Sequence, residues 1–377
     1  MGVAPLVMTG PVFVYGPLGW GPLLRAVLGQ DGLDRARIAY LPEHEVTAQS
    51  GAPLMAGLSP GTGRVEGWLV SECDAAARLA YFAEAFGMGA PTPVTLDLAG
   101  LNAEAQTFPG QPGPEPWHQG GWANLWGDLI LTAAAEITEL MTRIPAADLG
   151  GRLQMVLSRA SARLAAGRGV PADLRSVTEA SQVDEIASDI SHAGYFLSRD
   201  YTLRHPRFDG SMSAPMRREV FVATDAALVL PYDPVTDRVL LVEQFRMGPY
   251  GRGDVRPWML EPVAGRMDAG ETAEQTARRE CLEEAGLELR ALETISSHYC
   301  TPGYSTEYFH LFLGLCDLPA ETVGQGGLAS EQEDIRTHII GYERAMALLE
   351  SGEADNGPLI LSLMWLERER ARLRASA

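Results

Sequence analysis

Three glutamates at helical spacing are the residues of this chain best placed to do chemistry together. Glu280, Glu283 and Glu284 stand at i, i+3 and i+4 in a stretch with few helix breakers, so a helix would bring their carboxylates to one face. Most charge runs of this kind are solvated helix faces. Here, however, an apolar run (residues 259–264) and a glycine-containing turn come first, so the carboxylates would gather beside a strand-to-helix turn.

Carboxylates held at that spacing repel one another, and a bound cation would relieve the repulsion. Magnesium suits such a cluster because it takes hard oxygen ligands while keeping waters and substrate phosphates around it. The pattern therefore predicts magnesium-dependent attack on a phosphate anhydride. The helix boundaries are also marked, since Thr272 and Gln275 form a capping box and Gly286 follows the last helical position at Ala285.

Residues 265–287 resemble the signature of the Nudix hydrolases. The chain matches that signature at every fixed letter, namely Gly265, Glu271, Arg279, Glu280, Glu283, Glu284 and Gly286. Within it, Arg279 and Glu271 would form a structural ion pair that orients the loop. Cys281 stands where the family has a larger aliphatic residue, and since cysteine behaves as a small hydrophobe we expect it to pack in the interior.

The resemblance implies a role for each remaining group. Glu280 and Glu284 would be the principal helix ligands of Mg2+, for which Mn2+ could substitute. The carbonyl of Ala264, just before the signature glycine, would be a backbone ligand. Glu283 would be a further ligand or a catalytic group that orders water.

Segments outside the signature resemble the ADP-ribose pyrophosphatase subfamily. Pro302 falls 15 residues after Leu287 and opens a Gly-x-Ser-x-Glu run that this subfamily shares. Similar segments occur at residues 204–210, 217–219, 243–246, 258–265 and 331–336. The resemblance therefore extends from about Gly194 to the C-terminus. It implies Mg-dependent hydrolysis of ADP-ribose, or a related nucleoside diphosphate derivative such as NADH or a sugar nucleotide, to AMP and ribose 5-phosphate.

The same resemblance assigns the substrate contacts. Arg218 and Arg246 would bind the pyrophosphate, because guanidinium groups match phosphate oxygens well. Glu307 and Tyr195 would also contact the substrate, and Tyr195 would stack on adenine, although core packing is the ordinary role of such an aromatic residue.

The resemblance further implies that the Gly-rich, acidic stretch 326–333 closes over the substrate. There Glu331 would be the base that activates water and Glu333 a supplementary metal ligand, and the choice between the two stays open. A nucleotide-binding sensor with a degraded site is the alternative from another class. Five intact carboxylates argue against it, because a pure binder does not need them.

The N-terminal region resembles the gamma-glutamylcyclotransferase-like fold. Residues 12–18 (Val-Phe-Val-Tyr-Gly-Pro-Leu) match its opening strand and loop, and residues 65–70 fit the same layout. Its catalytic glutamate would fall at Ala83, with Glu84 about 100° further round a helix. We therefore expect a scaffold or ligand sensor without cyclotransferase activity, with an active cyclotransferase as the alternative. The pairing of the two modules resembles bacterial proteins associated with tellurite resistance.

Changes in composition predict three parts in an α/β chain. Residues 1–116 would form a smaller, mixed β-barrel and α domain, ending in the Pro/Gly-rich segment 109–116. Residues 117–170, rich in Ala, Leu, Glu and Arg, would form a helical connector. Residues 171–377 would form a Nudix domain, an α/β/α sandwich around a mixed sheet.

Composition also limits the partners. The chain has 377 residues and a formal charge of −19, which disfavours binding to nucleic acid or to an anionic membrane surface. All 30 basic residues are arginine, which excludes Schiff-base and Walker-type lysine chemistry.

The cysteines and the N-terminal stretch indicate the cellular compartment in which the protein is expected. The four cysteines have no paired spacing, which indicates reduced thiols in the cytoplasm. The apolar stretch 11–28 is broken by Gly and Pro, so we expect neither a signal peptide nor a membrane span. The family resemblance implies a homodimer.

Overall fold

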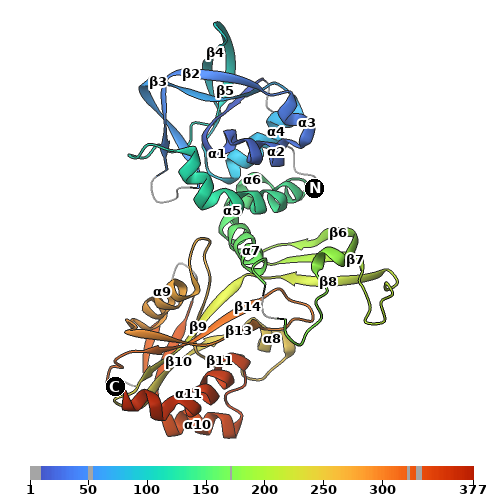
Figure 1. The fold of residues 1–377 in the computed structure, drawn as a ribbon. Coiled ribbons are helices and arrows are strands. Elements are labelled where there is room, and N and C mark those ends of the chain that lie inside the picture. The colour runs from blue at the N-terminus through green and yellow to red at the C-terminus, as the bar shows by residue number, and fades with distance from the viewer. Residues whose placement is uncertain (1–9, 50–53, 170–171, 321–322, 328–332) are drawn as a thin grey trace. The chain divides into compact units, whose positions relative to one another are not determined.

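The chain is α/β and forms two compact units, Met1–Glu219 and Val220–Ala377 (Figure 1). The computed structural model describes residues 10–49, 54–169, 172–320, 323–327 and 333–377. Within these residues no helix is both long enough and apolar enough to cross a membrane. The predicted boundaries at residues 116 and 170 remain a proposal about domains, since both lie inside the first unit.

A closed five-stranded barrel forms the core of the first unit, as the sequence predicts for this region. Its strands, in spatial order, are β1 (Val12–Val14), β3 (Ala56–Val70), β2 (Arg37–Ala48), β4 (Thr92–Leu98) and β5 (Leu101–Thr107). β1 closes the barrel by pairing in parallel with β5, whereas the other pairs are antiparallel. Alternate side chains point inward and make the core, among them Phe13, Tyr15, Leu41, Val65 and Leu96.

Seven helices separate or follow the barrel strands in the sequence of the first unit's described residues. They are α1 (Gly16–Gly19), α2 (Gly21–Leu28), α3 (Gln30–Asp34), α4 (Cys73–Ala85), α5 (Gln119–Leu140), α6 (Ala146–Gly150) and α7 (Leu153–Ala166). α5 packs against the junction of α1 and α2 through Trp122, whose ring lies 5.5 Å from that of Trp20. The Pro/Gly-rich segment before α5 is also attached to the barrel, because Ala48 N donates to Glu115 O (2.8 Å) and Trp117 N to Val46 O (3.0 Å).

A three-stranded sheet completes the first unit. After the 3-10 turn η1 (Ala180–Gln182), β6 (Asp184–Ala193), β7 (Leu197–Arg204) and β8 (Met216–Val222) pair in sequence order. The last residues of β8 lead into the second unit.

The second unit is built on an eight-stranded mixed sheet. The main path runs β13 (Ala291–Tyr299), β14 (Tyr308–Leu315), β9 (Asp225–Asp233), β10 (Arg238–Phe245), β16 (Ile335–Gly341) and β15 (Val323–Gly326). Two short strands join it off this path, β11 (Trp258–Glu261) on β10 and β12 (Val263–Arg266) on β9. β9 and β14 run parallel, and the other pairs are antiparallel.

Helices cover both faces of this sheet, as the α/β/α prediction requires (Figure 1). α9 (Ala273–Ala285) packs Ala277 and Cys281 on one face, while α10 (Tyr342–Ser351) and α11 (Gly357–Ala375) pack on the other. The alternation along β9 decides this, since Val229 faces α9 and Leu230 faces α10 and α11. Cys281 is 0% exposed, which confirms its predicted place in the core. The short helix α8 (Met247–Arg252) links β10 to β11.

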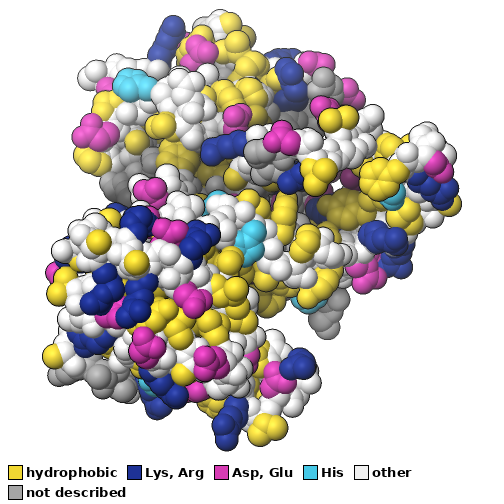
Figure 2. All heavy atoms as spheres, turned by 60° about the horizontal axis from the view of Figure 1, so that its bottom comes forward, with side chains coloured by type: hydrophobic (Ala, Val, Ile, Leu, Met, Phe, Trp, Pro, Cys, Tyr) yellow, Lys and Arg dark blue, Asp and Glu magenta, His cyan; other side chains and the backbone are white. Residues whose placement is uncertain are grey.

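The net negative charge is not gathered into one acidic surface on the face shown in Figure 2, where arginines lie beside acidic side chains. The ion pairs on α11 illustrate this interspersion. Arg372 bridges Glu293 and Glu369, each at 2.9 Å. Such exposed pairs contribute little stability individually, but they keep the surface charge mixed.

Candidate active site

The strand-to-helix turn from β12 to α9 positions the carboxylates. The Thr272 hydroxyl accepts from Gln275 N (3.2 Å), and Thr272 N donates to Gln275 Oε1 (2.8 Å), which completes the predicted capping box. Gly286 ends the helix in the left-handed conformation, with φ +63°. These local signals fix which residues face the turn, and they confirm the predicted helix boundaries.

Arg279 links three carboxylates of the turn. Its Nε and Nη2 bind the two oxygens of Glu271 at 2.9 and 3.0 Å, which confirms the predicted ion pair. Nη1 also binds Glu280 Oε1 (2.7 Å) and Glu283 Oε2 (3.0 Å). One guanidinium therefore offsets the repulsion between side chains that the helix forces onto one face.

Glu280 and Glu284 are held in surroundings that disfavour their negative charge. Glu284 is 2% exposed, and burial together with nearby carboxylates raises its pKa to about 8. Burial also raises the pKa of Glu280 to about 7, against the opposing effect of Arg279. Glu333 lies close enough to raise the pKa of both. Ala264 borders the same space, because its N–H donates to Glu284 Oε2 at 3.4 Å.

Two glycines make room for this cluster. A Cβ on Gly265 would lie 1.8 Å from Glu280 Oε1, so the signature glycine is needed for close approach of the carboxylate to the backbone. A Cβ on Gly326 would lie 1.7 Å from the carbonyl oxygen of Glu284. Gly326 therefore lets β15 approach the end of α9. Because Glu333 follows β15 in the chain, this approach helps to bring Glu333 near the carboxylates of α9.

A second ion pair borders the cluster. Arg246, at the end of β10, donates from Nε to Glu261 Oε2 on β11 (2.7 Å) and lowers the pKa of Glu284 by its charge. Glu261 is largely buried, and burial raises its pKa, while Arg246 opposes that effect. Glu261 is a site residue that spacing and motif alone did not indicate. The feature that could have indicated Glu261 is its position within residues 258–265, a segment that resembles the subfamily and leads directly into the signature.

Comparison with known proteins identifies this arrangement. A NUDIX domain model matches residues 222–362. The ADP-ribose pyrophosphatase of Escherichia coli K12 is 39% identical over 194 residues, which are 52% of this chain and 92% of that protein. The chain belongs to the Nudix family. The Haemophilus influenzae ADP-ribose pyrophosphatase is 35% identical over 52% of this chain and 90% of that protein. A GDP-mannose pyrophosphatase of Salmonella paratyphi B is 32% identical over 49% of this chain and 92% of that protein.

The Nudix unit, as we call Val220–Ala377, brings together most of the predicted metal-site residues. Ala264, Glu280, Glu283, Glu284 and Glu333 gather at the β12–α9 turn, with Arg246 beside them. Glu331 lies outside the described residues.

The other residues that we predicted to contact the substrate lie outside the β12–α9 turn in the sequence. Glu307 precedes β14 beside Cys300, whose pKa is raised to about 11 by burial and by that carboxylate. Arg218, on β8, and Tyr195, between β6 and β7, belong to the first compact unit. Arg218 is exposed, and its Nη1 donates to Arg217 O (2.8 Å). Tyr195 is 63% exposed, with its ring 4.9 Å from that of Phe196. Their roles, like that of Glu307, remain predictions.

The chemistry of the donor set fits a divalent cation. Glu280 and Glu284 offer hard oxygen ligands that burial and mutual repulsion make costly to ionise, so a cation would supply the charge they lack. Among the described residues, no three His, Cys, Asp or Glu side chains already form a ligand set. Arg279 instead engages Glu280 and Glu283.

Proposed function

We propose that the Nudix unit hydrolyses the pyrophosphate of ADP-ribose with Mg2+, giving AMP and ribose 5-phosphate. The observation that carries the proposal is the convergence of Glu280, Glu284 and Glu333 at the β12–α9 turn, where Gly265 lets the Glu280 carboxylate lie directly against the backbone. Relatives named ADP-ribose pyrophosphatase support the choice of substrate.

Glu280, Glu284 and the Ala264 carbonyl would hold the cation, with Glu333 as a supplementary ligand. When bound, Mg2+ would offset negative charge on the pyrophosphate and favour attack by water. Mn2+ has the same preference for carboxylate, carbonyl and water oxygens and could take its place.

Arg246 would bind a phosphate oxygen, since its guanidinium lies at the edge of the carboxylate cluster and keeps donors beyond the one that Glu261 accepts. Arg218, Glu307 and Tyr195 would contact the remainder of the substrate, with Tyr195 against adenine. These three assignments rest on the family resemblance.

The reaction consumes one water. Glu331 accepts a proton as the water oxygen bonds to phosphorus, the bridging P–O bond breaks, and the leaving phosphate takes the electron pair. Glu283, held by Arg279 at 3.0 Å, orients that water. Glu333 is the other candidate for the base.

A GDP-mannose pyrophosphatase among the relatives makes a sugar nucleotide the second candidate substrate. The two candidates share the anhydride and differ in the groups on either side of it. Initial rates on ADP-ribose, NADH and GDP-mannose, each with Mg2+, with Mn2+ and with EDTA, test the proposal. We expect the highest kcat/KM on ADP-ribose and no turnover in EDTA. Turnover that persists in EDTA, or a preference for GDP-mannose, would contradict it.

The assembly and location of the protein are further proposals. We propose a homodimer in the cytoplasm, and sedimentation equilibrium of the full chain tests the dimer. The absence of cyclotransferase activity is tested by incubation with gamma-glutamyl amino acids, in which we expect no 5-oxoproline.

A further inference from the structure

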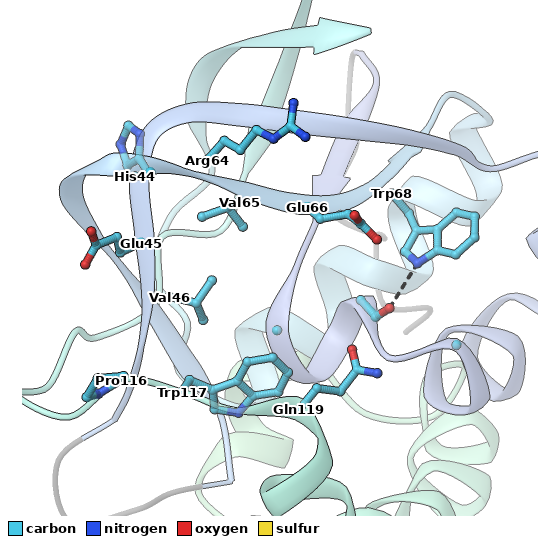
Figure 3. Close-up of a pocket in the computed structure, with 15 residues that line it drawn as sticks. His44, Glu45, Val46, Arg64, Val65, Glu66, Trp68, Pro116, Trp117 and Gln119 are labelled. Atoms are coloured by element: carbon cyan, nitrogen blue, oxygen red, sulfur yellow. Dashed lines mark hydrogen bonds between the residues drawn. The ribbon is translucent and has the colours of Figure 1, made fainter. Parts of the chain in front are cut away.

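The barrel of the first unit contains a cavity of about 580 Å³ that the Nudix reaction does not use (Figure 3). Strands β2 and β3, the glycine-rich turn around α1 and the segment leading into α5 provide its walls. A volume of this size is typical of small-molecule sites. Gly16, Gly19 and Gly21 line one side, so no side chains from that turn fill the space.

Two tryptophans line the cavity in fixed positions. Trp68 Nε1 donates to Gly19 O at 3.0 Å, which ties the indole of β3 to the glycine-rich turn. The backbone N–H of Trp117 donates to Val46 O (3.0 Å), and its ring lies 6.1 Å from that of Trp122, while its indole Nε1 is buried without a hydrogen-bond partner in the described part of the chain. The Trp68 indole is therefore oriented without a ligand, and the Trp117 ring packs beside Trp122, which lowers the entropic cost of binding a ligand between them.

The charged groups of the cavity favour a positive ligand. Figure 3 shows the Glu66 carboxylate near the Trp68 indole, with the Gln119 amide and the Trp117 ring below it. Glu45 is a further lining residue, although Figure 3 shows its carboxylate turned away from Glu66. His44 and Arg64 line the cavity as well, and the Arg64 guanidinium carbon stacks 4.3 Å from the centre of the Tyr40 ring.

We propose that this cavity binds a small organic cation, an ammonium or quaternary ammonium compound. Tryptophan is the aromatic side chain that attracts cations most strongly, and a nearby carboxylate adds attraction of the same sign. The indoles of Trp68 and Trp117 would contact the alkyl groups around the nitrogen, and Glu66 would balance its charge.

The cavity is less suited to an anionic amino-acid derivative. Glu45 and Glu66 would repel a carboxylate, and Arg64 is already stacked on Tyr40. Neither Ala83 nor Glu84, the α4 positions nearest to the cyclotransferase pattern, is among the residues that line it, and Ala83 is 0% exposed in the core.

Isothermal titration calorimetry of the full-length protein tests the proposal. The probes are choline, putrescine, the neutral choline isostere 3,3-dimethylbutan-1-ol, and the dianion glutarate. We expect at least one of the cations to bind, and both neutral isostere and glutarate to bind at least about tenfold more weakly. Equal binding of choline and its isostere, tighter binding of glutarate, or no binding of either cation would overturn the proposal.

A matched pair of variants places the site. Glu66→Gln keeps the shape of the side chain and removes its charge, and we expect the Kd of the bound cation to rise about tenfold. Glu104→Gln is the control, because Glu104 is an exposed residue of β5 outside the cavity. Turnover of ADP-ribose should be unchanged in both, and an unchanged circular dichroism spectrum of each variant shows that the barrel unit is still folded. An unchanged Kd in Glu66→Gln, or an equal rise in the control, would contradict the assignment.

Discussion

The Nudix turn and the barrel cavity both gather glutamates, but in opposite surroundings. Glu284 is 2% exposed among other carboxylates, and its pKa is raised to about 8, whereas Glu66 is exposed at the wall of an open cavity. A buried cluster must be neutralised by protons or by a cation, because low-dielectric surroundings disfavour like charges. Water solvates the charge of an exposed carboxylate, so such a side chain needs no neutralising partner and can only attract a ligand. The buried cluster can therefore bind a small, highly charged ion, while the cavity suits a larger, weakly hydrated one.

Removing a carboxylate from the buried cluster should have the largest effect. Glu284→Gln keeps the side-chain volume but removes a metal ligand, so we expect kcat/KM on ADP-ribose to fall by about 100- to 1000-fold. Steady-state rates with Mg2+ measure this. Glu274→Gln is the matched control, because Glu274 is exposed on the first turn of the same helix. Undiminished turnover in Glu284→Gln would exclude this helix from the reaction.

Filling the space beside Glu280 should have the next largest effect. In Gly265→Ala the new Cβ would lie 1.8 Å from Glu280 Oε1, so the carboxylate must move. We expect kcat/KM to fall about 10- to 100-fold and the Mg2+ concentration for half-maximal rate to rise. Gly248→Ala provides the comparison, since nothing lies within 4 Å of a Cβ there. Equal rates in the two variants would show that the position of Glu280 is not critical.

Local signals explain why the buried site could be predicted. The capping box of Thr272 and Gln275 and the stop at Gly286 depend on neighbouring residues only, so the limits of α9 follow from the sequence. The apolar runs at residues 226–230 and 239–242 are likewise typical of buried strands, and they fall within β9 and β10. The ion pair of Arg279 with Glu271 is confirmed, but its further bonds to Glu280 and Glu283 follow from side-chain geometry that the spacing alone does not specify.

Long-range pairing explains what could not be predicted. β2 was not expected, and only the last residues of β3 were, because Gly57, Pro60, Gly61 and Gly63 interrupt the strand pattern. Pairing of the two strands with each other overrides that composition. The cavity depends on this hairpin, so no local pattern indicated it. In the same way, burial of Glu261 is produced by the pairing of β10 with β11.

The pH dependence of stability should separate the two regions. The folded state keeps the Glu284 proton up to about pH 8, whereas an unfolded chain loses it near pH 4.5. The folded state thus binds more protons between these values, so its stability should fall as pH rises from 4.5 to 8. Calorimetry in EDTA should show a smaller fall in Glu284→Gln than in the wild type. Added Mg2+ should raise the wild-type Tm most at the upper end of this range. Parallel curves for the two proteins would contradict the raised pKa.

The smallest effect is expected at the barrel cavity. Glu66 has no burial to overcome, so in EDTA we expect the Glu66→Gln and wild-type curves of Tm against pH to agree within about 1 °C, as for most exposed substitutions. The same variant should lose cation affinity, which would show that its carboxylate acts in binding without a stability cost. If Glu66→Gln instead has a clearly higher Tm than the wild type between pH 5 and 8, the negative charge of Glu66 destabilises the protein when no ligand is bound. The two glutamate sites would then differ in degree rather than in kind.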